Sequence, residues 1–212
     1  MKFDVYFFDL DGTIANTYEG IRGGIRYAAQ ELGYPPLPEE KVATFIGPPL
    51  VDSFAREYHL TEEEALVMQE KYREYYVKTG VHEFRIFDGF PEMLQALKAN
   101  GKELYVVTSK PTPQSEVIIK ESGLAPYFTA VIGATLDGSI SKKEDVIRHA
   151  LTHFGISSDS IVMVGDTDND ILGAKKNHLP SIAVRYGFGT DQEIAAAKPD
   201  YIVDTPQEIL AI

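Results

Sequence analysis

A pair of acids directly follows the pattern of a buried strand in the stretch Val5-Tyr6-Phe7-Phe8-Asp9-Leu10-Asp11-Gly12-Thr13. Its apolar residues, Val5–Phe8, are followed at once by two carboxylates and a glycine. An uninterrupted apolar run is typical of a strand covered on both faces, as in a parallel sheet. Because ligands bind at the carboxyl ends of such strands, Asp9 and Asp11 are predicted to lie in a site.

Further short apolar runs follow along the chain, and segments of helical period separate them. One helical stripe ends at Gly155, a residue typical of helix C-termini, and Thr112-Pro113 is interpreted as an N-cap followed by Pro at the first helical position. This alternation predicts an α/β fold, a doubly wound, Rossmann-like parallel sheet. The additional predicted strands are Leu104–Val107, Ala130–Ile132, Ile161–Val164, Ile182–Val184 and Tyr201–Val203.

Residues 16–81 break the alternation. An apolar stripe from Ile21 to Leu32 ends at Gly33, and Thr61 with Glu64 forms a capping-box pattern that opens a long helix through Lys78. The segment is too long for an ordinary loop. We therefore expect a catalytic core of residues 1–15 and 82–212 and an inserted helical cap domain of residues 16–81.

Composition narrows the classes of function. The chain has 212 residues, no cysteine and a net charge of −12, so disulfides and zinc–thiolate sites are excluded, and nucleic-acid or anionic-membrane partners are disfavoured. An anionic substrate remains compatible if a bound cation inverts the local field. No segment has the pattern of a signal peptide or a membrane span, and a cytoplasmic location is expected.

A second acidic cluster, Gly165-Asp166-Thr167-Asp168-Asn169-Asp170, follows the predicted strand at residues 161–164. Asp166 stands at the strand end, and Asp170 stands about one helical turn later, as a ligand or as a partner of a ligand. Carboxylates this close repel one another unless a cation or a shared proton relieves them.

Hydroxyl, lysine and glycine residues complete the set of candidates at the strand ends. Thr108 and Ser109 follow the predicted strand at residues 104–107, and hydroxyl groups at such turns bind phosphate. Lys142 and Lys143 enter a helix, although lysines there oppose the helix dipole. Gly12 allows the backbone to turn sharply near a ligand.

Together these residues resemble the motifs of the haloacid dehalogenase superfamily, with most similarity to its phosphoglycolate phosphatase-like branch. The resemblance rests on Asp9-Leu10-Asp11-Gly12-Thr13, Thr108, Lys142 and the segment 165–170, in this order. The helical insertion is similar to that superfamily's cap. Because the dehalogenase branch lacks an acid at the position of Asp11, the resemblance implies a phosphatase.

The resemblance also implies roles for the acids. Asp9 would attack phosphorus and form an aspartyl-phosphate, while the Asp11 side chain would protonate the leaving group and then deprotonate the attacking water. The cofactor would be Mg²⁺, held by the Asp9 and Asp166 carboxylates and the backbone carbonyl of Asp11. Asp170 completes the expected metal-site residues.

Further residues are expected to bind the substrate. Thr108 would donate a hydrogen bond to the phosphoryl group, and Lys142 would neutralise its charge, with Lys143 as the competing candidate. Ser109 and Gly12 are the other expected phosphate contacts. Arg22 is a candidate for the substrate-facing surface of the cap.

We therefore predict a phosphoric monoester hydrolase for a small phosphorylated metabolite such as 2-phosphoglycolate, acting as a monomer or weak homodimer. A nucleotide phosphatase, an inorganic pyrophosphatase and a phosphosugar mutase carry the same motifs and remain alternatives. A phospho-accepting receiver-type signalling module is an alternative of a different class.

Overall fold

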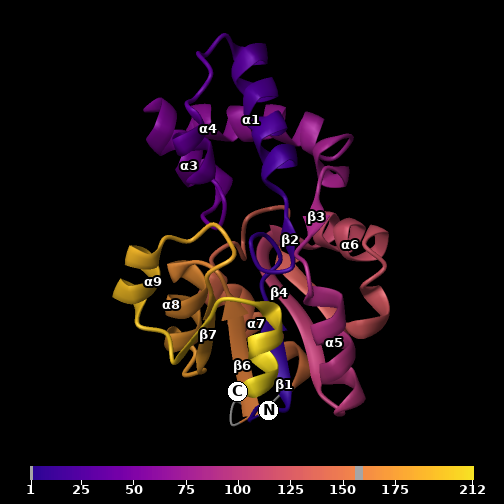
Figure 1. Cartoon of the computed structure of the whole chain (residues 1–212). Helices are drawn as coiled ribbons and strands as arrows, with labels where there is room; N and C mark the ends of the chain where they lie inside the picture. Colours follow the sequence, from indigo (N-terminus) through magenta and orange to yellow (C-terminus); the bar gives the residue numbers. More distant parts are fainter. Residues whose placement is uncertain (1, 156–159) are drawn as a thin grey trace. The chain divides into compact units, whose positions relative to one another are not determined.

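The computed structural model describes residues 2–155 and 160–212, and the chain forms two compact units (Figure 1). Unit 1 comprises Met1–Asn16 and Ile86–Ile212, and unit 2 comprises Thr17–Arg85. Unit 2 is therefore inserted between residues 16 and 86 of unit 1, and it ends a few residues later than the predicted limit at residue 81.

Unit 1 is built on a six-stranded sheet in the order β5-β4-β1-β6-β7-β8. All neighbouring strands run parallel, so the predicted parallel sheet is confirmed, and each predicted run lies within one of its strands. These are β1 (Val5–Phe8), β4 (Glu103–Pro111), β5 (Ala130–Ala134), β6 (Ile161–Gly165), β7 (Ser181–Val184) and β8 (Tyr201–Val203).

Strand β1 lies at the point in the sheet from which later strands are added on both sides. The chain continues outward from β4 to β5 on one side of β1, and from β6 through β7 to β8 on the other. Phe8 at the end of β1 is in register with Val106 of β4 and Val164 of β6. The loops after these three strands therefore leave the same edge of the sheet, at the kind of switch point where parallel sheets bind ligands.

Successive residues of β1 point to opposite faces of the sheet, and all four of them are apolar and buried. Both faces of the sheet are therefore apolar, and helices cover both. Val5 and Phe7 share a buried core with Val146 of α7. On the other face, the Phe8 ring packs edge-on against Phe90 of α5, with 5.4 Å between ring centroids. The helices of unit 1 are α5 (Phe90–Ala99), α6 (Thr112–Glu121), α7 (Lys143–Phe154), α8 (Asp168–Lys176) and α9 (Asp191–Ala197), with 3-10 turns at Ala125–Tyr127 and Pro206–Ala211.

Unit 2 consists of helices held by an aromatic core. Phe54 is fully buried, and its ring centroid lies 5.0 Å from that of Phe45 and 6.2 Å from that of Tyr72. The helices are α1 (Tyr18–Leu32), α2 (Glu39–Ala43), α3 (Leu50–Tyr58) and α4 (Glu62–Tyr76), followed by a 3-10 turn at Gly80–His82.

Most of the predicted helix ends are confirmed. The Thr61 N–H donates to the Glu64 carboxylate at 2.8 Å and the Glu64 N–H donates to the Thr61 hydroxyl at 3.3 Å, so the capping box forms as predicted. Gly33 and Gly155 end α1 and α7 in the left-handed conformation. The predicted N-cap at Thr112 is wrong, because α6 begins at Thr112 itself and the Thr112 hydroxyl accepts the Gly133 N–H instead.

Two short strands were not predicted from the sequence. β2 (Ala15–Asn16) and β3 (Arg85–Ile86) form a separate two-stranded sheet, and each is too short for a periodic pattern. Within residues 2–155 and 160–212, no helix has both the length and the apolar character needed to cross a membrane.

Candidate active site

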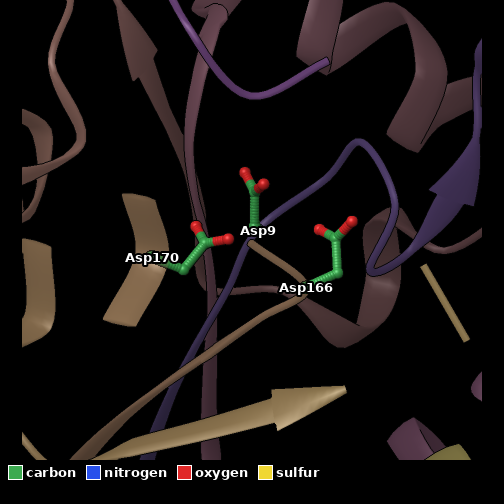
Figure 2. A group of neighbouring side chains, drawn as sticks. All are labelled: Asp9, Asp166 and Asp170. Atoms are coloured by element: carbon green, nitrogen blue, oxygen red, sulfur yellow. The ribbon is translucent and has the colours of Figure 1, made fainter. Parts of the chain in front are cut away.

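Three buried carboxylates meet at the edge of the sheet where β1 and β6 end. Asp9 follows β1, Asp166 follows β6, and Asp170 lies in the first turn of α8. One carboxylate oxygen from each lies within 4.8 Å of the others, and Figure 2 shows the three groups gathered at the strand ends. The parallel register of β1 and β6 thus joins two acidic motifs that lie far apart in the sequence.

Lys143, the first residue of α7, carries the positive charge among these acids. Its Nζ lies 2.5 Å from Asp9 Oδ1 and 2.8 Å from Asp170 Oδ1, and it also donates to the Val107 carbonyl at 3.3 Å. Burial by itself lowers the pKa of Lys143, but the adjacent Asp170 and Asp9 carboxylates outweigh burial and raise the pKa above its usual value. The ammonium group therefore stays charged at neutral pH.

The structure brings Lys143, the competing candidate, and not Lys142 into contact with these acids. Lys142 is the exposed N-cap residue of α7, whereas the Lys143 side chain is only 3% exposed. The reason is helical phase: Lys143 belongs to the same buried face as Val146, Ile147 and Ala150. This spacing is visible in the sequence, and extending the apolar stripe back by one turn selects Lys143 over Lys142.

The acids carry more negative charge than the protein itself balances. Burial raises the pKa of the Asp9 carboxyl to about 6 although Lys143 opposes the shift, and burial together with Asp170 and Asp9 raises the pKa of Asp166 well above its usual value. This cluster of described residues holds three carboxylates and one ammonium, that of Lys143, which contacts Asp9 and Asp170. The donor set fits a divalent cation with oxygen ligands, which would balance the two remaining charges.

Backbone and hydroxyl groups fix the orientation of Asp166. The Thr13 hydroxyl donates to its Oδ1 at 3.2 Å, and the Phe188 N–H donates to its Oδ2 at 2.8 Å. Gly12 has φ +85°, and a Cβ at this position would overlap the Asp166 carboxylate. No residue type predicts the Phe188 contact, because its donor is a backbone N–H, which every residue except proline carries.

A second ion pair lies beside the first. Both oxygens of Asp11 accept from Lys110 Nζ, at 3.0 and 2.9 Å, and the side chains of Asp11 and Lys110 are 13% and 6% exposed. Lys110 was not predicted as a site residue. The available signal was its position two residues after Thr108, near the end of the same strand.

A family model described as haloacid dehalogenase-like hydrolase matches residues 6–184 of this chain. The chain belongs to this family. The match includes every acid and lysine described above, so the family predicted from the sequence is confirmed. A crystal structure of a predicted phosphatase from Clostridium acetobutylicum, which is 40% identical, covers 100% of both chains with a TM-score of 0.95.

Two relatives within this family carry names for different substrates. A 5'-nucleotidase from Pseudomonas aeruginosa is 38% identical over 201 residues, covering 95% of this chain and 91% of that protein. A phosphoglycolate phosphatase from Vibrio parahaemolyticus is 29% identical over 215 residues, covering 97% and 93%. This chain therefore resembles hydrolases of both names along nearly its whole length.

The remaining predicted residues of this haloacid dehalogenase-like chain lie in different surroundings. Thr108 is buried at the end of the sheet, where its hydroxyl accepts the Lys110 N–H at 3.2 Å, and Ser109 is half-buried. The Gly12 N–H already donates to the Ala15 carbonyl at 2.9 Å, so the observed part of Gly12 is to make room for Asp166.

Arg22 lies in unit 2 and is paired there. Its guanidinium contacts Glu19 at 2.8 Å and Glu39 at 3.1 Å. Two carboxylates thus compete with any anion for this side chain, and a contact between Arg22 and substrate stays a prediction.

Proposed function

We propose that this protein is a Mg²⁺-dependent phosphatase that hydrolyses small phosphate monoesters through an aspartyl-phosphate at Asp9. The protein is a phosphoric monoester hydrolase, in keeping with its family and the names of its relatives. The observation that carries the proposal is the contact of Asp9 with Lys143 beside Asp166, with Asp11 two residues further along. This arrangement supports the assignment of a nucleophile, a countercharge and a separate acid at one strand end.

In the first step, a carboxylate oxygen of Asp9 forms a bond to phosphorus as the bond to the leaving oxygen breaks. The leaving oxygen takes a proton from Asp11. Water then attacks the phosphorus of the aspartyl-phosphate and gives a proton to Asp11. The bond between phosphorus and Asp9 breaks, which releases inorganic phosphate and restores both carboxyl groups.

Lys143 and Thr108 act on the phosphoryl group. The Lys143 ammonium lies against Asp9 and neutralises charge on the transferring group, while the buried Thr108 hydroxyl donates a hydrogen bond to it. Both groups are held by packing before substrate arrives, which reduces the reorganisation needed during the reaction.

Mg²⁺ would be held by the carboxylates of Asp9 and Asp166 and, from the family resemblance, the Asp11 carbonyl. Asp170 lies within the same group of oxygens, and its carboxylate also holds Lys143 and the Thr167 N–H. When bound, the ion supplies Lewis-acid stabilisation of the phosphoryl oxygens and lowers repulsion between Asp9 and the substrate.

The substrate class is a small phosphorylated metabolite, with unit 2 acting as the cap that selects it. The phosphoglycolate phosphatase-like motifs favour 2-phosphoglycolate. The second candidate is a nucleoside 5'-monophosphate, because the relative named 5'-nucleotidase has higher identity, 38%, than the phosphoglycolate phosphatase, 29%.

A phosphate-release assay tests the proposal. The purified protein is given Mg²⁺ and a panel containing 2-phosphoglycolate, nucleoside monophosphates, sugar phosphates, pyrophosphate and p-nitrophenyl phosphate, with chelator as control. We expect turnover of at least one monoester in Mg²⁺ and none with chelator or in Asp9→Asn. Failure to hydrolyse every compound, or a long-lived phospho-Asp9 without turnover, would contradict the phosphatase and favour the receiver-type alternative.

A further inference from the structure

Lys110 is a buried lysine that has no part in the reaction described so far. Its Nζ lies 2.9 and 3.0 Å from the two carboxylate oxygens of Asp11, and its side chain is 6% exposed. Removing a lysine and a carboxylate from water is costly unless the two are paired and hydrogen-bonded. The pair therefore holds both side chains in one arrangement.

The backbone of β4 delivers Lys110 to this place. The pairing of β4 with β5 is regular up to Val107, and its register then shifts before Pro111. Such irregularities change the direction of side chains at strand ends. Gly133 of β5 makes the close approach possible, because a Cβ there would overlap the Lys110 carbonyl.

The two acids of the first motif thus have different cationic partners. Asp9 contacts Lys143 from α7, and Asp11 contacts Lys110 from β4. A free aspartate carboxyl rotates broadly about its last side-chain torsion. Because Lys110 binds both oxygens of Asp11, it opposes this rotation.

We propose that Lys110 is a positioning residue for the general acid–base. It holds both oxygens of the Asp11 carboxylate that takes a proton from the attacking water, and it holds the unprotonated oxygen of the Asp11 carboxyl that gives a proton to the leaving oxygen. This inference rests on the proposed phosphatase function and adds a residue to which that proposal assigns no role. Lys110 acts through Asp11, whereas Lys143 acts on Asp9 and the phosphoryl group.

Steady-state kinetics of Lys110→Met and Lys110→Arg on an alkyl phosphate test the inference. Misplacing a reacting group by about 1 Å costs about 100-fold, so we expect kcat of Lys110→Met to fall about 10- to 100-fold with KM changed less than threefold. The guanidinium fork also binds both oxygens of a carboxylate, so Lys110→Arg should recover part of kcat. Lys120→Met, on the exposed face of α6, is the matched control and should behave as wild type.

A double-mutant cycle with Asp11→Asn separates positioning from direct substrate binding. If Lys110 works through Asp11, Lys110→Met causes less than a threefold further loss in the Asp11→Asn background. An equal loss in both backgrounds, or a rise in KM at constant kcat, overturns the inference and makes Lys110 a substrate contact.

Melting temperatures of the variants and the activity of the wild type distinguish the remaining outcomes. If Lys110→Arg matches Lys110→Met in kcat and both melt well below wild type, Lys110 is structural and the inference is wrong. Wild-type turnover with unchanged kcat in Lys110→Met overturns the inference alone. Absence of wild-type turnover on every monoester overturns the proposed function and this inference with it.

Discussion

Replacing the nucleophile should make the metal-free protein more stable. Burial raises the pKa of Asp9 from its usual 3.8 to about 6, so the folded state disfavours the ionised carboxylate. A difference of about two pH units at about 1.4 kcal/mol each gives a penalty on the order of 3 kcal/mol at pH 7. Asparagine has nearly the same shape without the charge. We therefore expect Asp9→Asn to raise the free energy of unfolding of the metal-free protein by about 1–3 kcal/mol.

The pH dependence of this gain follows from the direction of the shift. Since the pKa of folded Asp9 lies above the value of 3.8 expected when unfolded, ionisation favours the unfolded state. The penalty is absent below about pH 4, grows between about pH 4 and 6, and is complete above that range. The advantage of Asp9→Asn should therefore vanish at the acidic end and reach its full size at pH 7.

Magnesium should reverse the effect. An ion at about 100 times its Kd stabilises the folded state by about 2.7 kcal/mol, and Asp9→Asn lacks one of its ligands. Wild type should thus gain more from Mg²⁺ than the variant, and the difference in stability should shrink or change sign. The variant should have no detectable turnover in either condition.

Differential scanning calorimetry of chelator-treated and Mg²⁺-loaded protein at several pH values measures both effects. Asp88→Asn, which changes an exposed aspartate of unit 1, is the matched control and should shift stability by less than about 0.5 kcal/mol. Metal-free Asp9→Asn melting below wild type at pH 7, or a gain of equal size at pH 4 and pH 7, would refute the reasoning.

Three other predictions concern the same edge of the sheet. Asp11→Asn should lower kcat for alkyl phosphates by about 10²–10⁴-fold. With p-nitrophenyl phosphate, whose good leaving group needs no acid, the variant should give a burst of nitrophenol followed by slow turnover. Rapid-quench kinetics would measure both effects. Lys143→Met leaves carboxylates buried without their cation, so it should abolish turnover and destabilise the metal-free protein by about 3–5 kcal/mol. The control Lys142→Met should keep kcat within threefold of wild type. Equal losses of kcat in the two variants would contradict the assignment of Lys143. Gly12→Ala places a Cβ against the Asp166 carboxylate and should weaken Mg²⁺ binding by about 10–100-fold in a calorimetric titration, so unchanged affinity would remove Asp166 from the metal site.

Local signals in the sequence were enough to predict the six strands of the main sheet and several helix ends. The apolar run at Val5–Phe8 is a parallel strand, and the Thr61–Glu64 pattern is a capping box with both hydrogen bonds formed. These features depend on neighbours within a few residues, so a pattern in the chain specifies them. The strand order is different, because each apolar run satisfies the requirements of any interior position in a parallel sheet.

The tertiary structure decided which side chains face one another. Asp9 and Asp166 were identified from the sequence because each follows an apolar strand, but their approach to within 4.8 Å depends on β6 pairing with β1. Lys143 and not Lys142 contacts the acids because the phase of α7 buries the side chain of Lys143 and leaves that of Lys142 exposed. Lys110 reaches Asp11 across 99 positions of sequence, through the shifted end of β4. The sequence by itself determined which residue types stand at the strand ends, and packing determined their partners, because the free energy of a buried charge depends on the groups that the fold brings beside it.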